Sequence, residues 1–195
     1  EEPAPTILAP GDIAPLRGQH VVARALEQLG HDPRLKDVVV IFAGAAGGGR
    51  RNAYAEQLGW IARRSGAQGR VFLTGPLDDM PAAMMLADVV ACMPTEPLGQ
   101  DPVAARAAAL GKPLVAANHG ATAEVVEEGV TGRLAAPTNP DEVAAAFADI
   151  LTLDVKARSQ MADMARRRAL TYFSAIESAH ATVRVYAALA AATER

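Results

Sequence analysis

Short apolar runs alternate with segments of helical periodicity along the first two thirds of the chain. The run 37–44 is continuous and rich in β-branched residues, which is typical of a strand buried on both faces. The intervening segments repeat apolar residues every three or four positions, and two of them end in Gly30 and Gly66. The pattern predicts strands at 6–10, 37–44, 70–75, 88–93, 113–118 and 131–137, and helices at 20–30, 52–66, 80–87, 102–110 and 121–129.

Strands that alternate with helices predict βαβ units, and therefore a mostly parallel, Rossmann-like α/β sheet with helices on both faces. After residue 140 every segment is predicted to be helical. Asn139 and Pro140 form a cap followed by a proline at the first helical position, and Ser174 with Glu177 forms a capping box that opens the final helix. The three arginines at 166–168 are most simply explained as a solvated helix face.

The composition narrows the choice of partners and compartment. The chain has 195 residues, 50% hydrophobic and 21% charged, enough for a sizeable core in one large domain or two small ones. A net charge of −3 argues against a nucleic-acid partner, which needs a dense basic face. The single cysteine, Cys92, can form no internal disulfide, so a reducing, cytoplasmic location is expected. The acidic, proline-rich start is not expected to be a signal peptide, and no apolar run reaches the roughly 18 residues that span a bilayer.

Open parallel sheets bind ligands at the carboxyl ends of their strands, so the loops that follow the predicted strands are the candidate sites. In the loop at 11–20, Gly11 lets the backbone approach a ligand and Arg17 can fork onto phosphate oxygens. A glycine-bearing turn with a surface arginine explains the same residues. At 47–51, three glycines and two arginines fit a phosphate cradle, but their spacing is unspecific and a surface loop is the simpler explanation.

The loop at 94–103 places the carboxylate of Glu96 between a strand and a helix. Asp101 suits an N-cap and Pro102 the first helical position, so a helix N-terminus suited to an anion is expected there. Beside that anion, Glu96 would accept hydrogen bonds from sugar hydroxyls; otherwise it is a solvated loop acid.

The loop at 118–124 carries His119, a candidate base or ligand, although a lone loop histidine is usually neither. No cluster of His, Cys, Asp or Glu in the sequence has the spacing of metal ligands. The sequence also contains no nucleophile elbow and no plausible hydrolase triad.

Short motifs follow one another in a recognisable order: Arg17-Gly18, Glu96-Pro97-Leu98-Gly99, Gly111-Lys112-Pro113-Leu114-Val115-Ala116, Gly120-Ala121, Glu124-Val125-Val126 and Gly129-Val130-Thr131-Gly132-Arg133-Leu134. From Gly11 to its end, the chain resembles the C-terminal half of a GT-B glycosyltransferase of the large retaining family 4, the glycosyl transferases group 1. Each motif is weak alone, but their order and spacing over nearly the whole chain are specific.

The resemblance implies one half of a GT-B architecture, with residues 1–10 as a linker and first strand and 11–195 as a single nucleotide-sugar-binding domain. It implies two catalytic residues: Arg17, which holds the donor diphosphate, and Glu96, which binds sugar hydroxyls. The other implied donor contacts, several of them through the backbone, are Gly11, Gly75, Pro76, Leu98, Gly99, Gln100 and Arg106. The backbone at 75–77 would lie close to the base.

The implied activity is retaining transfer of a hexosyl group from a UDP- or GDP-sugar. The missing N-terminal domain would bind the unknown acceptor, so this half alone would bind nucleotide weakly and transfer little. Cations and helix N–H groups would stabilise the charge that the departing diphosphate gains. GT-B enzymes generally use no bound metal and no cofactor besides the donor. Peripheral membrane contact is common among them, and a bacterial origin is expected.

Three departures from the family pattern keep an alternative open. The family's arginine after the loop glycine is Asp12 here, and its second glutamate falls at Ala104 or, counted back from Gly111, at Arg106. Asp101, as a cap, would oppose a phosphate by roughly 1 kcal/mol at ~4 Å in bulk water, which Arg106 would offset. The alternative is a degenerate, non-catalytic GT-B-like domain that serves as a binding or structural module.

Overall fold

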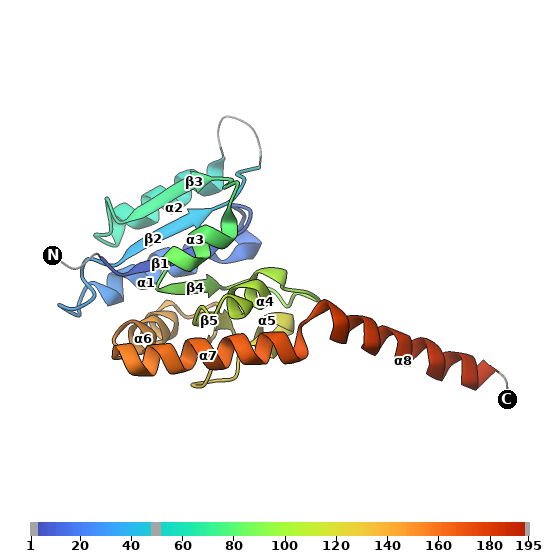
Figure 1. Ribbon diagram of the computed structural model, residues 1–195. Coiled ribbons are helices and arrows are strands. Elements are labelled where there is room, and N and C mark those ends of the chain that lie inside the picture. Colours follow the sequence, from blue (N-terminus) through green and yellow to red (C-terminus); the bar gives the residue numbers. More distant parts are fainter. Residues whose placement is uncertain (1–3, 48–51, 194–195) are drawn as a thin grey trace.

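The computed structural model describes residues 4–47 and 52–193, which form one parallel sheet of six strands with helices on both faces (Figure 1). The predicted α/β class, parallel sheet and two helical layers are confirmed. Each strand pair in the sheet is parallel. The strands are β1 (Thr6–Pro10), β2 (Val39–Ala43), β3 (Val71–Gly75), β4 (Val89–Cys92), β5 (Leu114–Ala117) and β6 (Gly132–Ala135).

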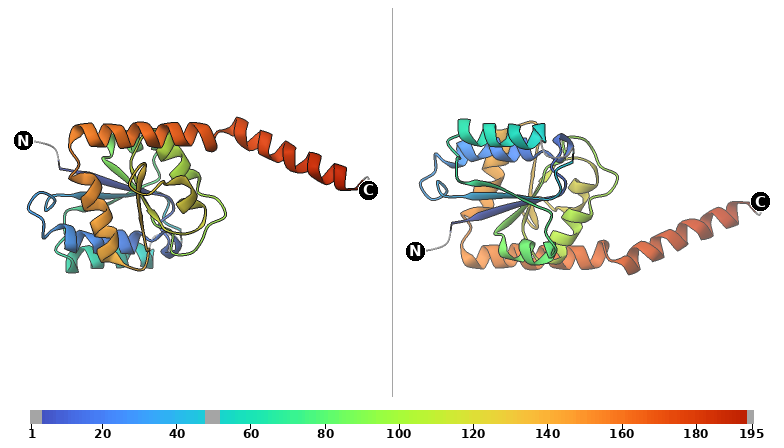
Figure 2. Two further views of the ribbon diagram at one scale, coloured as in Figure 1. Left: turned by 90° about the horizontal axis from the view of Figure 1, so that it is seen from below. Right: turned by 90° about the horizontal axis from the view of Figure 1, so that it is seen from above.

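The two helical layers lie on opposite sides of the sheet (Figure 2). One consists of α1 (Gln19–Leu29), α2 (Ala53–Arg64) and α6 (Pro140–Leu151); the other of α3 (Met80–Leu86), α4 (Pro102–Ala109), α5 (Gly120–Val125) and α7 (Val155–Tyr172). Side chains alternate across a strand, so within β1 Ile7 joins the apolar cluster of the first layer and Leu8 that of the second.

The sheet order β3-β2-β1-β4-β5-β6 places β1 and β4 side by side at the centre. The chain leaves β1 towards β2 and β3, then returns to the other side of β1 as β4, where Leu8 pairs with Val90. This reversal is the topological switch point, where open parallel sheets form a ligand-binding crevice at the carboxyl ends of the strands. Because β1 is bonded to both neighbours, residues 6–10 belong to the same folded unit as the rest.

Short polar side chains start the helices where the sequence predicts them to. Asp101 Oδ1 accepts a hydrogen bond from the N–H of Ala104, and Pro102 follows it as the first residue of α4. Asn139 caps α6 in the same way. At the start of α8 (Ala175–Thr193), Ser174 Oγ accepts from the N–H of Glu177, which forms half of the predicted capping box. The Glu177 carboxylate instead lies 3.6 Å from Nδ1 of His180.

Arg166 and Arg167 on α7 are exposed, as a solvated helix face predicts, but Arg166 and the half-buried Arg168 also bind the ends of neighbouring helices. Arg166 Nη1 donates a 2.8 Å hydrogen bond to the carbonyl of Ala109, at the last turn of α4. Arg168 donates to the carbonyls of Glu124 and Val125, at the end of α5. Helix C-termini leave carbonyls without partners, and cationic side chains from another helix satisfy them.

The final helix, α8, projects away from the sheet (Figures 1 and 2). Its apolar side chains are exposed, with Ile176, Val183, Tyr186 and Leu189 each at 60% or more. Among the helices of the described residues, none is long and apolar enough to serve as a membrane-spanning segment.

Candidate functional site

The loop between β1 and α1 is locked against the carboxyl end of β4. Gly18 has a φ of 70°, and a Cβ at this position would overlap the carbonyl oxygen of Met93. The N–H of Thr95 donates a 2.9 Å hydrogen bond to the carbonyl of Leu16 in the same loop. A short 3₁₀ turn, Pro15–Arg17, closes the loop before α1. The close approach therefore requires glycine at 18 and brings Arg17 to the crevice between β1 and β4.

Gly11 forms the other end of this loop and lies under Arg17. Its φ is 125°, and its N–H donates to the carbonyl of Ala43 at the end of β2. A Cβ at Gly11 would lie 3.6 Å from Nε of Arg17, so the guanidinium stem passes directly over this glycine. Gly44 packs more closely than Gly11, since a Cβ at Gly44 would overlap the carbonyl oxygen of Gly11. The backbone of three strand ends thus meets beside Arg17.

Arg17 lies beside the start of α4. It shares the lining of a small cavity with Cys92, Asp101 and Val103, at the carboxyl ends of β1 and β4. The Arg17 side chain is half-buried, and within the described part of the chain its guanidinium has no ion-pair or hydrogen-bond partner. An unpaired guanidinium beside a helix N-terminus is suited to bind an anion with two oxygens.

Each oxygen of the Asp101 carboxylate has a hydrogen-bond partner in the protein. Asp101 is only 8% exposed. One oxygen caps α4 at Ala104, and the other accepts a 2.8 Å hydrogen bond from the hydroxyl of Thr122, a fully buried residue of α5. Burial, together with the charge of Asp101, raises the pKa of the Cys92 thiol well above its usual value, against the opposing effect of Arg17. Cys92 is therefore a neutral, buried neighbour of both charges.

Glu96 does not share this cavity. Its side chain is exposed and makes no hydrogen bond or ion pair with any residue between 4–47 and 52–193. The loop that carries it is held two residues later, where the N–H of Ala121 donates to the carbonyl of Leu98 and a Cβ at Gly120 would press on the Leu98 backbone. The structure therefore fixes Leu98 through α5 and leaves the Glu96 carboxylate free to meet a ligand from solution.

Gly99, Gln100 and Arg106 line a different groove, of about 650 Å³, with Tyr172 and Phe173 at the corner between α7 and α8. Gly99 and Gln100 are exposed in the β4–α4 loop and do not line the small cavity beside Arg17. Arg106 is exposed on α4 and is not brought together with Arg17.

Gly75 and Pro76 lie at the carboxyl end of β3, at one edge of the sheet. They share the ligand-binding edge with Arg17, but β2 lies between β3 and β1. His119 precedes α5, and its Nδ1 is buried without a hydrogen-bond partner among the described residues. The predicted cradle residues Gly48, Gly49, Arg50 and Arg51 lie outside the described residues.

A pair of residues at the same edge, His20 and Tyr54, escapes sequence analysis. The Tyr54 hydroxyl accepts from the backbone N–H of His20 and lies 2.9 Å from its ring Nδ1. Burial raises the pKa of Tyr54 to about 12, while burial and the nearby charge of Arg24 lower the pKa of His20. No spacing in the sequence signals this contact, because the partners are 34 residues apart and start two different helices.

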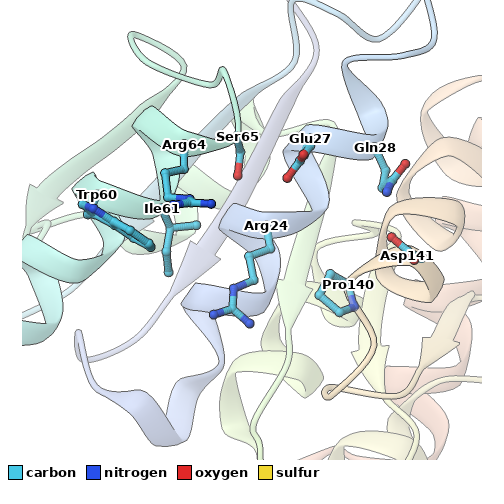
Figure 3. A pocket seen from close by; sticks show the side chains of 9 residues that line it. All are labelled: Arg24, Glu27, Gln28, Trp60, Ile61, Arg64, Ser65, Pro140 and Asp141. Atoms are coloured by element: carbon cyan, nitrogen blue, oxygen red, sulfur yellow. The ribbon is translucent and has the colours of Figure 1, made fainter.

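A third groove, of about 580 Å³, lies in the layer of α1, α2 and α6 (Figure 3). Trp60 and Arg64 on α2 face Arg24 and Glu27 on α1, and the guanidinium of Arg64 lies 4.9 Å from the centre of the Trp60 ring. None of the residues predicted for donor binding lines this groove.

The chain belongs to the glycosyl transferases group 1, whose family model matches residues 4–153. A D-inositol 3-phosphate glycosyltransferase of Xylanimonas cellulosilytica is 34% identical over 189 residues, which cover 94% of this chain and 42% of that protein. A GDP-mannose-dependent alpha-(1-6)-phosphatidylinositol monomannoside mannosyltransferase of Mycobacterium tuberculosis is 32% identical, over 75% of this chain and 38% of its own length.

Among solved structures, Anabaena Alr3699/HepE in complex with UDP and glucose is similar, with a TM-score of 0.81 and 30% identity over 93% of this chain and 48% of that one. The chain therefore spans about half the length of the proteins that it matches. The family and the fold predicted from the sequence motifs are confirmed.

Proposed function

We propose that this chain is the donor-binding half of a retaining glycosyltransferase and binds a nucleoside-diphosphate sugar at the crevice between β1 and β4. The observation that carries the proposal is the guanidinium of Arg17, which has no partner in the described residues and lies beside the start of α4 at the switch point. The solved structure of a relative with UDP and glucose supports the ligand class.

In this proposal, Arg17 forks onto the diphosphate of the donor and stabilises the charge that it gains as the glycosidic bond breaks. The exposed carboxylate of Glu96 accepts hydrogen bonds from hydroxyls of the transferred hexose. The backbone at Leu98, Gly99 and Gln100 contacts sugar and phosphate, Gly11 lets the diphosphate approach, and Gly75 and Pro76 border the base. Arg106 lies apart, so we propose for it only a weak, long-range attraction of the anionic donor.

The nucleotide is proposed to be UDP or GDP. A UDP complex of one relative and the GDP-mannose dependence of another support these two bases. We assign acceptor binding, and any peripheral membrane contact, to the half of these relatives that the chain does not span. The chain alone would then bind the donor weakly and transfer little sugar. The single, buried thiol supports a cytoplasmic location.

Calorimetric titration of the chain with UDP, GDP and ADP tests the proposal. We expect binding of UDP or GDP that weakens by about tenfold or more in Arg17→Ala, because the substitution removes a charge-assisted contact. Arg167→Ala is the matched control, since Arg167 is an exposed arginine on α7 and should leave the affinity unchanged. Absence of binding to all three nucleotides at about 1 mM would contradict the proposal.

A second candidate is a non-catalytic domain that keeps the fold without the activity. The buried carboxylate of Asp101, which occupies an N–H of α4, favours it, and so does the exposed carboxylate of Asp12 in the loop that holds Arg17. A sugar-transfer assay on the full-length protein separates the two candidates. Turnover that disappears in Arg17→Ala would exclude the non-catalytic domain.

A further inference from the structure

Gln19, the first residue of α1, is a buried polar side chain at the floor of the same crevice. It is only 1% exposed. Its Nε2 donates a 2.8 Å hydrogen bond to the carbonyl of Asp12, which can only accept, so the orientation of the amide is fixed by chemistry. Its Oε1 is buried and has no hydrogen-bond partner within the described residues. A buried acceptor without a donor costs free energy, and native proteins usually satisfy it.

Gln19 lines the small cavity that Arg17 and Asp101 also line. The volume of the cavity is about 20 Å³. A cavity of this volume can admit a water molecule. A buried water also needs two or more polar partners. The guanidinium of Arg17 can donate to it, while Asp101 and Gln19 can accept from it.

We propose that this cavity holds one ordered water molecule, which donates to Oε1 of Gln19 and accepts from Arg17, and that Gln19 thereby acts as a positioning residue for the Arg17 guanidinium. Gln19 also ties the start of α1 to the loop at Asp12, so the water would link this fixed backbone contact to the guanidinium of Arg17. The inference rests on the proposed function only where it concerns nucleotide affinity.

A crystal structure of the chain, at a resolution that reveals ordered water, tests the site without any variant. We expect density for one water within hydrogen-bond distance of Gln19 Oε1. Density that shows this oxygen bonded to a protein group, or an empty cavity, would overturn the proposal. This measurement stands even if no nucleotide binds, so a failure of the proposed function can be told from a failure of the water site.

The positioning role is tested with Gln19→Met, which keeps the length of the side chain and removes both hydrogen bonds. Gln28→Met, an exposed glutamine on the same helix, is the matched control. We expect the water to be lost and the affinity for UDP or GDP to fall about tenfold, with unchanged circular dichroism. Wild-type affinity in Gln19→Met would overturn the positioning role.

A double-mutant cycle separates positioning from a general structural effect. In Arg17→Lys the charge remains but the planar fork is gone, so Gln19→Met should weaken nucleotide binding by less than about threefold in that background. A loss of about tenfold in both backgrounds would show that Gln19 does not act through Arg17.

Discussion

The two loops that border the crevice differ in how firmly the protein holds them. The loop from β1 to α1 is fixed along its length, because Gly18 packs under the carbonyl of Met93 and Leu16 accepts from Thr95. The loop from β4 to α4 is fixed at three points: at Thr95 by Leu16, at Leu98 by the start of α5 and at Asp101 by Thr122. Between these points Glu96, Gly99 and Gln100 are exposed.

This difference separates the two parts of the proposed donor site. The cation is in place before any ligand arrives, since the backbone that carries Arg17 can hardly move without breaking contacts with β4. The acid is not held in place, because the side chain of Glu96 is exposed; in the proposed site it would gain contacts only when a sugar binds. Preorganised charges stabilise a transition state most effectively, so the diphosphate side is expected to dominate binding of this half alone.

The largest effect is expected for Gly18→Ala, a substitution in the fixed loop between β1 and α1. The new Cβ would overlap the carbonyl oxygen of Met93, in a backbone conformation with a φ of 70° that alanine rarely adopts. We expect the free energy of unfolding to fall by about 3–5 kcal/mol, as for other substitutions that force packed backbone apart. Urea unfolding, followed by circular dichroism, measures it.

Gly66→Ala is the matched control for this prediction. Gly66 has a similar φ of 62°, but no atom lies within 4 Å of a Cβ at that position. Gly66→Ala should therefore lower the free energy of unfolding only by the cost of a left-handed backbone conformation for alanine, about 1 kcal/mol. Equal losses in the two variants would show that the contact with β4 contributes nothing and that the two loops do not differ as described.

The next effect concerns Asp101, at the fixed end of the β4–α4 loop. Asp101→Ala removes the cap of α4 and leaves the buried hydroxyl of Thr122 without its acceptor, so stability should fall by about 2 kcal/mol. Asp101→Asn keeps the cap through its amide oxygen and presents its N–H₂ to the Thr122 hydroxyl, which can accept from it, so this variant should lose less. The amide also removes a negative charge beside Arg17, so UDP or GDP should bind several-fold more tightly to Asp101→Asn, about 1 kcal/mol at most.

Calorimetry and urea unfolding of both Asp101 variants check these opposite directions. Weaker nucleotide binding in Asp101→Asn than in the wild type would contradict the view that the carboxylate opposes the donor. A stable Asp101→Ala would contradict the fixed attachment of the loop to α5.

The fold follows from local pattern to a large extent. The run at 37–44 identifies β2 because β-branched residues in a continuous row have few alternatives, and Asn139 with Pro140 identifies the start of α6 within the local sequence. The roles of Arg166 and Arg168 could not be predicted. Their partners are carbonyls at the ends of α4 and α5, 57 and 43 residues or more away in sequence, and carbonyls carry no sequence signal.

Individual residues of the candidate site could be predicted from the sequence, but the contacts between them could not. Strand-end loops indicate Arg17, and the cap and proline indicate the start of α4 nearby. The hydrogen bond between Asp101 and Thr122 could not be predicted, because the two residues are 21 positions apart and nothing in the sequence pairs them. Gln19 likewise resembles any polar residue at a helix start, and only the structure reveals that its oxygen is buried without a hydrogen-bond partner among the described residues.

Glu96→Gln changes an exposed residue of the β4–α4 loop and should have a smaller effect, confined to ligand binding. The side chain is exposed and makes no hydrogen bond or ion pair with the described residues, so the free energy of unfolding should stay within about 0.5 kcal/mol of the wild type. Affinity for UDP or GDP should not change, whereas the corresponding nucleotide sugar should bind up to about fivefold more weakly, because one charged acceptor for hydroxyls is lost. An equal loss for nucleotide and nucleotide sugar would place Glu96 near the phosphates instead.

The smallest effect concerns pH and the pair of His20 and Tyr54, beside the fixed loop. Burial lowers the pKa of His20 below its ordinary value of 6.5, so between the two values the unfolded chain binds more protons than the folded one. The stability contributed is present above the unfolded pKa and declines as the pH falls through 6.5 towards the folded pKa. Because the ring is partly exposed, the decline should be only a few tenths of a kcal/mol.

Urea unfolding between about pH 7.5 and 5.5 should show a shallower pH dependence in His20→Gln than in the wild type. Identical profiles would show that protonation of this ring leaves the fixed loop unaffected.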